Sequence, residues 1–232
     1  RLAGLPDLAR VREPAGVDHR AGGGDGAVAA ERGGEVVTQL EAVGVAEAAG
    51  YALAVQLFVV LQSLAMVPWN LASPELNRLH TLNLHASLQQ RFARVLVATL
   101  GVATAGAVLL VSAGPWALAL VGSGTALPAR PVLALMAIAF VLELNHGACA
   151  NLLATGNRVP FVRAYLATGI AIVVASLWAA PAAGVAGLVA VNLVLQLAYN
   201  NWHWPLAVAR LFDAPYARVV ATGFAWSQPL PR

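Results

Sequence analysis

The chain has 232 residues, of which 59% are hydrophobic and 11% are charged, and its mean hydropathy is +0.70. Soluble domains usually carry about 25% charged residues, so this composition excludes a soluble globular fold. The formal charge of +3 is modest and the arginines lie in loops and tails, which argues against nucleic-acid binding. The single cysteine, Cys149, excludes an intramolecular disulfide and is expected to be a small packing residue.

Five apolar runs of roughly 17 to 25 residues predict membrane-spanning helices. A helix rises about 1.5 Å per residue, so about 20 residues cross a hydrocarbon core of about 30 Å. We expect Pro68 to kink or end the first span. In the second span Gly114-Pro115 is expected to interrupt the helix, so this span either ends near residue 111 or continues beyond the interruption to residue 121. The expected spans are residues 51–70, 95–121, 131–154, 162–180 and 185–205. The predicted fold is all-α, a polytopic transmembrane bundle of about five spans over residues 47–212.

Basic residues are unevenly distributed among the loops that follow these spans. They are Arg78, Arg91 and Arg94 after the first, Arg130 after the second, Arg158 and Arg163 after the third, none after the fourth, and Arg210 and Arg218 after the fifth. Loops rich in Arg face the cytoplasm, so the segment before Tyr51 is expected outside and residues 213–232 form a cytoplasmic tail. This pattern predicts a multi-pass protein of the inner (plasma) membrane. His80 and His85, in the first cytoplasmic loop, are expected to be solvated.

Residues 1–46 are rich in Gly, Ala and Arg and contain no long apolar run. They are expected to form a polar extramembrane segment that is either disordered or the product of an out-of-frame reading. Because this segment has no signal-peptide pattern, we expect the chain to be the C-terminal part of a larger protein.

Polar residues recur at helical spacing in three alternate spans. They are Gln56, Ser63 and Asn70 in the first, Glu143, His146 and Asn151 in the third, and Asn192, Gln196, Tyr199, Asn200 and His203 in the fifth. Because an ionisable group at the bilayer centre costs at least about 2.5 to 3.5 kcal/mol, Glu143 is expected to face protein or water. We interpret the three stripes as the walls of a shared substrate path. The alternative is that they only hydrogen-bond neighbouring helices, at about 0.6 kcal/mol a pair.

No catalytic motif is present in the sequence. HExxH, Walker, CxxC and GxSxG patterns do not occur. We therefore expect a protein that is not an enzyme and that needs neither a metal nor another cofactor.

Five segments, taken in order, are similar to one known family. They are residues 43–54 (VGVAEAAGYALA), 73–79 (SPELNRL), 114–122 (GPWALALVG), 152–158 (LLATGNR) and 181–187 (PAAGVAG). Together they resemble the C-terminal lobe of polysaccharide and O-antigen flippases of the multidrug/oligosaccharidyl-lipid/polysaccharide exporter superfamily. The resemblance implies half of a two-lobe transporter, with five of its twelve spans in this chain.

The resemblance also implies a function: translocation of a lipid-linked oligosaccharide or polysaccharide precursor by alternating access. The partners it implies are membrane lipids, the lipid-linked glycan and other membrane proteins of polysaccharide assembly, with no nucleic acid. The cationic part of the substrate site would lie either in the missing first lobe or in Arg78, Arg91 and Arg94, which would form a basic cytoplasmic mouth for the pyrophosphate. Two alternatives remain: a cation-coupled multidrug exporter lobe, with Glu143 and His146 as a proton or Na⁺ site, and a truncated membrane protein that does not transport.

Overall fold

The computed structural model describes residues 24–156 and 162–225, and within them the regular secondary structure is all α-helix, joined by short turns and loops. It divides into two units, Arg1–Val43 and Gly44–Arg232. Residues 1–23, which are part of the expected extramembrane segment, lie outside the described residues. The first helix, α1 (Gly24–Ala65), begins in the first unit, and side chains are described from residue 44 onward. The remaining fold belongs to the second unit.

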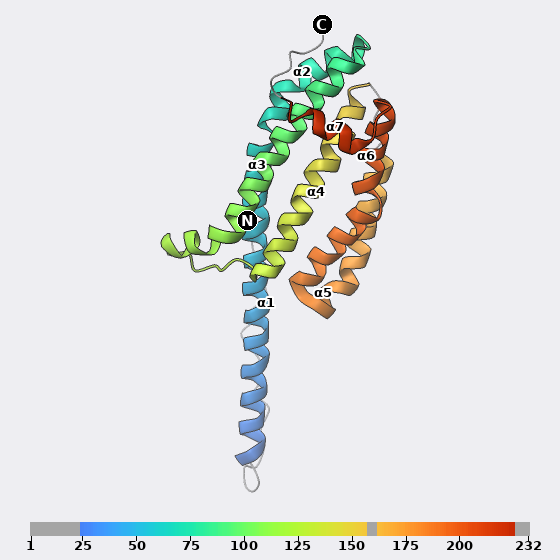
Figure 1. Cartoon of the computed structure of the whole chain (residues 1–232). Coiled ribbons are helices and arrows are strands. Elements are labelled where there is room, and N and C mark those ends of the chain that lie inside the picture. Colours follow the sequence, from blue (N-terminus) through green and yellow to red (C-terminus); the bar gives the residue numbers. More distant parts are fainter. Residues whose placement is uncertain (1–23, 157–161, 226–232) are drawn as a thin grey trace, which may run out of the picture. The chain divides into compact units, whose positions relative to one another are not determined.

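Four helical stretches of the described chain are long and apolar enough to cross a membrane. They are Gly44–Ala65 of α1, α3 (His85–Leu120), α4 (Arg130–Ala154), and the stretch Val162–Leu211, which comprises α5 (Val162–Ala198) and α6 (Asn200–Leu211). The last stretch has 50 residues, a length of about 75 Å as one straight helix, which is far more than a bilayer core. Its chain instead reverses direction within α5, so it crosses twice (Figure 1). This confirms the all-α bundle of about five spans.

The reversal in α5 occurs where the sequence PAAGVAG predicts a turn. Ala183 and Gly184 leave the helical conformation, and Gly184 has a φ of +54° and a ψ of −141°, which side chains with a Cβ rarely adopt. A Cβ at Gly187 would touch the backbone of Ala179, so the two legs of α5 approach closely beside the turn. Here small residues serve helix packing, as they commonly do in membranes.

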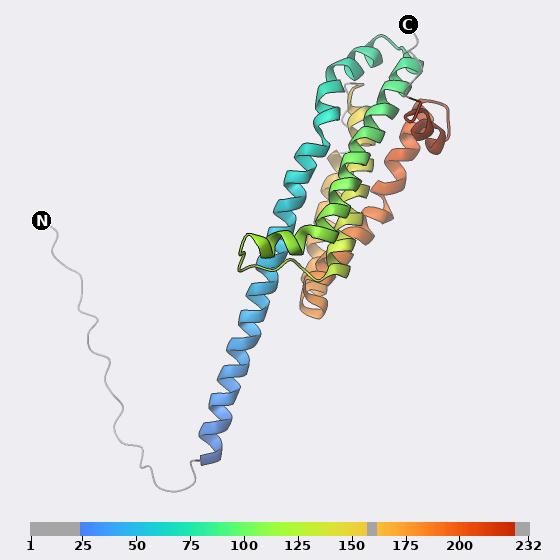
Figure 2. The ribbon, with the colours of Figure 1, turned by 60° about the vertical axis from the view of Figure 1, so that its left-hand side comes forward.

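The segment expected as the first cytoplasmic loop is mostly helical. Helix α1 ends at Ala65 and α2 (Val67–Thr81) follows with Pro68 in its first turn, where proline is well tolerated. Helix α2 packs on α3, and the two run side by side in Figure 2. His80 is half-buried, with its Nδ1 2.6 Å from Thr155 Oγ1 at the end of α4, so the prediction of a solvated His80 is wrong.

The described part of the expected cytoplasmic tail is also part of the bundle. Its short helix α7 (Tyr216–Thr222) packs on α3 and α6, and Val219 is fully buried. Tyr216 Oη donates a 2.6 Å hydrogen bond to Asn145 Oδ1 on α4. Arg94 of α3 donates a hydrogen bond to the carbonyl of Ala225 at 3.2 Å. These contacts join α7 and the residues after it to the middle helices.

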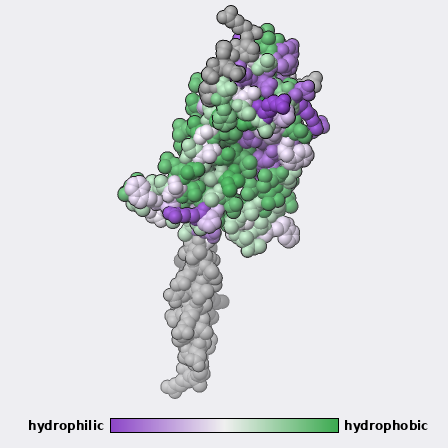
Figure 3. Space-filling view, viewed as in Figure 1, coloured by the Kyte–Doolittle hydropathy of each residue, from purple (hydrophilic) through white to green (hydrophobic). Residues whose placement is uncertain are grey.

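Two clusters of buried apolar side chains hold the second unit together. One joins α2, α3, α4, α6 and α7. The other joins α1, α3, α4 and α5, and its Phe58 and Phe140 rings lie 5.2 Å apart between centroids. Hydrophobic side chains also cover much of the outer face visible in Figure 3, as expected for a surface in contact with lipid. The last turns of α3, the helix that contains Pro115, turn away from the rest of the helix, as both ribbon views show (Figures 1 and 2).

Candidate functional site

Two adjoining polar cavities lie among α1, α4 and α5. The larger has a volume of about 380 Å³ and the smaller about 180 Å³. Gln62 of α1 and Glu143 of α4 line both cavities, so they stand at the junction between them. The polar and aromatic residues of the larger cavity are Tyr51, Phe58, Gln62, Phe140, Glu143, Ser176 and Asn192. Those of the smaller cavity are Gln62, Glu143, His146, Asn151 and Tyr165.

Helix α1 turns a different face to the cavities from the one predicted. Tyr51, Val55, Phe58 and Gln62 line the larger cavity and follow i, i+4, i+7 and i+11 spacing, which places them on one face of a helix. Gln62 and the predicted Gln56 point in directions about 120° apart around the helix, at 100° per residue.

The predicted stripe of Gln56, Ser63 and Asn70 lines neither cavity, and all three residues are exposed. Ser63 Oγ donates a hydrogen bond to the carbonyl of Val59 at 3.0 Å, within its own helix. Asn70 lies beyond the end of α1, on α2. A spacing of seven residues places side chains on one face of a helix but does not determine whether that face points inward. In α1 the inward face is the one that buries Phe58, Ala54 and Ala65.

Helix α4 brings its three predicted residues to the cavities. Glu143 is accessible and lines both, and Asn151 lines the smaller one. His146 also lines the smaller cavity, but only 1% of its surface is exposed, and its Nδ1 lies 3.0 Å from the carbonyl oxygen of Leu142. The adjacent Tyr165 of α5 completes this wall. A carboxylate, an imidazole, two amides and a phenol therefore surround a space of about 180 Å³, enough for a few waters at about 30 Å³ each.

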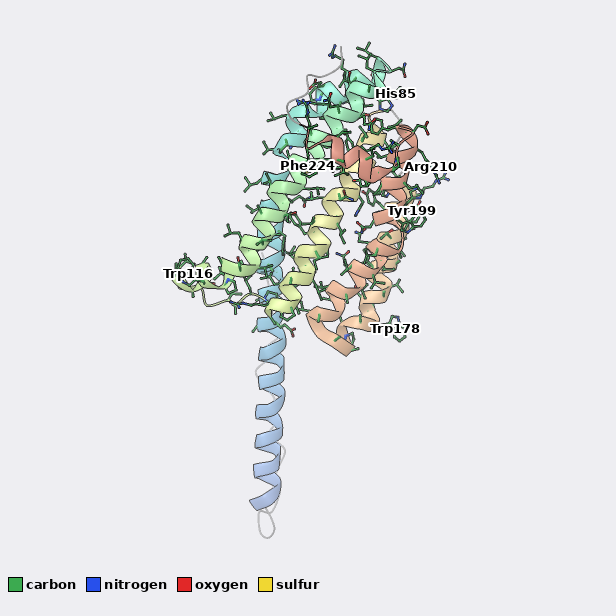
Figure 4. All side chains as sticks on the ribbon, in the orientation of Figure 1. His85, Trp116, Trp178, Tyr199, Arg210 and Phe224 are labelled. Atoms are coloured by element: carbon green, nitrogen blue, oxygen red, sulfur yellow. The ribbon has the colours of Figure 1, made fainter. Side chains whose placement is uncertain are left out.

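The predicted stripe on the fifth span is divided. Asn192 lines the larger cavity, whereas Gln196, Tyr199 and Asn200 line neither. The helix is interrupted at Tyr199, whose φ and ψ are −137° and −60°, so residues before and after it do not share one helical face. Tyr199 stacks on His203 with ring centroids 4.5 Å apart, on the same side of the bundle as Arg210 (Figure 4).

Asn200 instead forms a buried hydrogen-bond network. Its Nδ2 donates to Gln196 Oε1 at 2.7 Å and lies 3.5 Å from Thr168 Oγ1, and its Oδ1 accepts from Trp204 Nε1 at 3.0 Å. Asn200 has no exposed surface. Asn200 therefore bonds to the neighbouring leg of α5 at Thr168, as in the alternative of hydrogen bonding between helices, whereas the bond of Gln196 lies within its own span.

The sequence interpretation missed four polar cavity residues: Tyr51, Gln62, Tyr165 and Ser176. The spacing of Tyr51, Val55, Phe58 and Gln62 could have identified the first two. Tyr165 and Ser176 are single polar residues in an apolar helix, and their position emerges only from the packing of α5 on α4.

The three arginines of the predicted basic mouth lie on α2 and the first turns of α3, away from the cavities. Arg91 Nε is 2.7 Å from Glu75 Oε2, and Arg94 is hydrogen-bonded to Ala225, while Arg78 is exposed in the last turn of α2. Figure 4 shows His85, at the start of α3, and Arg210 toward one end of the bundle, and Trp178 toward the other. Arg158 lies outside the described residues. Glu143 is the only Asp, Glu, Lys or Arg among the described residues that line the two cavities.

Within the described part of the chain, no three His, Cys, Asp or Glu side chains cluster as metal ligands would. The cavity groups can instead donate and accept hydrogen bonds with hydroxyls and water.

The chain thus has the features of a polytopic helical membrane protein with a polar space among its spans. No protein-family model, curated protein or solved structure matches the chain.

Proposed function

We propose that the chain is a transport bundle that moves the head of a lipid-linked oligosaccharide or polysaccharide precursor across the membrane by alternating access. The observation that supports this most directly is the pair of adjoining polar cavities, with Gln62 and Glu143 at their junction, inside an otherwise apolar bundle. Polar groups at membrane depth are costly unless they meet water, protein or a ligand, and they commonly mark transport paths. We further propose that the bundle resides in the plasma membrane with its arginine-rich end in the cytoplasm.

The lining of the larger cavity suits a sugar better than a purely apolar ligand. Phe58 and Phe140 provide aromatic surface for the apolar face of a sugar ring, and the Gln62 and Asn192 amides can hydrogen-bond its hydroxyls. Its volume of about 380 Å³ is near the low end of the range of about 300 to 1,000 Å³ for ligand pockets. Glu143 would repel a pyrophosphate, so the anionic part of the lipid would remain near the exposed Arg78.

A second candidate, cation-coupled export, is favoured by the smaller cavity. Glu143, His146 and Asn151 surround it together, as a proton or cation relay would require. The third alternative, a membrane protein without transport activity, gives the cavity residues no role other than helix packing.

The test is a flipping assay in proteoliposomes with a fluorescent polyprenyl-pyrophosphate disaccharide, scored by access of an external glycosidase to the sugar. Gln62→Leu should slow flipping about fivefold, the effect of one lost hydrogen bond of about 1 kcal/mol. Gln56→Leu is the matched control, because it changes the same residue type on the same helix but away from the cavities.

Three results would count against the proposal. If wild-type protein does not flip the lipid, or if Gln56→Leu and Gln62→Leu slow it equally, glycan-lipid transport through these cavities is wrong. Absence of lipid flipping by the wild type, together with proton-driven efflux of an organic cation that Glu143→Gln abolishes, would favour the exporter instead.

A further inference from the structure

An apolar groove of about 790 Å³ lies along α3 beside α7. Helix α7 packs on α3 near one end of the bundle (Figure 1). Val220 of α7 and the following Phe224 line the groove, which follows α3 from Val97 to Ser112, a rise of about 22 Å. One hydrocarbon leaflet is about 15 Å thick. Among the described residues no charged side chain lines this groove, so it suits an extended hydrocarbon chain.

The middle of the groove is open space. Gly101 is exposed, and a Cβ placed on it would meet nothing within 4 Å. A Cβ placed on Gly223 would instead touch the backbone of Ala93 and would lie 2.7 Å from Val97 Cγ2, so the chain after α7 is pressed onto α3. The groove is therefore bounded by protein beside Val97 and unfilled farther along α3.

A positive charge lies at the bounded end. Arg94, Gly101 and Val108 follow each other at intervals of seven residues, so they share one face of α3. The half-buried Arg94 donates to the carbonyl of Ala225, the residue after Phe224, and a carbonyl does not neutralise the guanidinium. The apolar run of α3 begins directly after Arg94. An arginine at that point of a membrane span lies at the level of the lipid headgroups.

We propose that this groove binds one anionic phospholipid of the leaflet at the arginine-rich end, with its phosphate at Arg94 and an acyl chain along α3 over Gly101. Charge complementarity selects this occupant, because a guanidinium binds phosphate oxygens through paired N–H donors. The site is separate from the proposed transport path, since the polar cavities lie among α1, α4 and α5 and share no residue with the groove.

Photo-cross-linking in proteoliposomes tests the chain site, with a phosphatidylglycerol that carries a diazirine in one acyl chain and with labelled peptides mapped by mass spectrometry. We expect labelling of α3 between Val97 and Ser112. Gly101→Leu fills the open space and should lower this labelling at least about fivefold, and the variant should fold because leucine is a good helix former and the site is open. Gly169→Leu on α5, where a Cβ also meets nothing within 4 Å, is the matched control and should leave the labelling unchanged.

Competition between unlabelled lipids tests the headgroup site. Phosphatidylglycerol should suppress the labelling more strongly than phosphatidylcholine, and Arg94→Gln should reduce that preference about fivefold, the effect of one arginine near a membrane surface. Arg94→Lys keeps the charge and should retain most of the preference. Arg210→Gln removes an exposed arginine at the same end of the bundle as Phe224 (Figure 4), outside the groove, and should have no effect.

Four results would overturn the phospholipid site. They are labelling spread evenly over the lipid-facing helices, equal competition by the two phospholipids, unchanged labelling in folded Gly101→Leu, and an Arg94→Lys variant that behaves like Arg94→Gln. Stronger competition by a polyprenyl phosphate than by phosphatidylglycerol would assign the groove to a polyprenyl lipid and would also reject the phospholipid.

Discussion

Asn200 donates a hydrogen bond of 2.7 Å from its Nδ2 to Oε1 of Gln196, across the interruption of the helix at Tyr199. Asn200 is fully buried, and its Oδ1 accepts a hydrogen bond from Trp204. An asparagine side chain offers two donors and one carbonyl oxygen, so little capacity remains for a ligand. The pair therefore stabilises the junction of α5 and α6, while Asn192, eight residues earlier, faces the larger cavity.

We expect the two asparagines to give opposite phenotypes. Asn200→Ala removes the partner of the buried Trp204 indole and of the half-buried Gln196 amide and should destabilise the protein by about 1 to 3 kcal/mol. Asn192→Ala should leave the melting temperature nearly unchanged and slow lipid flipping. Thermal unfolding in detergent, followed with a thiol-reactive dye on Cys149, measures the first effect, and the proteoliposome assay measures the second. A large loss of stability in Asn192→Ala with wild-type stability in Asn200→Ala would reverse this assignment.

The contact between α7 and α4 predicts the reactivity of Cys149. The Cys149 thiol lies 3.4 Å from Tyr216 Oη, which donates its own hydrogen bond to Asn145. Tyr216→Phe removes a hydrogen bond with a typical net value of about 0.5 to 1.5 kcal/mol, so α7 should open more often and Cys149 should react with maleimide several-fold faster. Tyr199→Phe, a change in the same residue type away from α7, serves as the control. Equal labelling rates in wild type and Tyr216→Phe would show that this hydrogen bond does not hold α7 in place.

The turn within α5 depends on one glycine. Gly184→Ala forces a Cβ into a conformation that is nearly restricted to glycine, at a cost of about 1 to 3 kcal/mol, and should lower the melting temperature. Gly169→Ala lies in the same helix, where a Cβ meets nothing within 4 Å, and should be neutral or stabilising by up to about 1 kcal/mol. Differential scanning fluorimetry compares the two variants. If both have wild-type stability, the chain does not reverse at Gly184 in the way the structure describes.

The approximate number of spans could be predicted because bilayer thickness fixes the length of an apolar helix, but the limits of the first two differ from the prediction, since α1 ends at Ala65 and α3 begins at His85. Helix α4 occupies Arg130–Ala154, close to the expected 131–154, and the reversal of α5 falls at the predicted Pro/Gly turn. The docking of α7 was not predictable in the same way, since a seven-residue helix carries little periodicity and is held by partners such as Asn145, far away in the sequence.

The inward face of each span was harder to predict than its position. On α4 the prediction placed Glu143, His146 and Asn151 at the cavities because an ionisable residue strongly disfavours lipid. On α1 no charged residue indicated which face of the helix points to the cavities. Gln56 and Gln62 are both uncharged, and only the packing of α1 on its neighbouring helices distinguishes them. On the fifth span the error came from assuming one continuous helix through Tyr199.

Water access to α1 is the most direct test of the proposed path, because that path requires Gln62 and not Gln56 to face the polar cavities. In a Cys149→Ala background, Gln62→Cys and Gln56→Cys can be treated in native membranes with a small cationic methanethiosulfonate. That reagent needs a thiolate, which forms in water and not in lipid. We predict that Gln62→Cys reacts at least about tenfold faster than Gln56→Cys. Equal rates, or faster reaction at Gln56→Cys, would mean that α1 turns its other face to water and that the cavities described here are not the path.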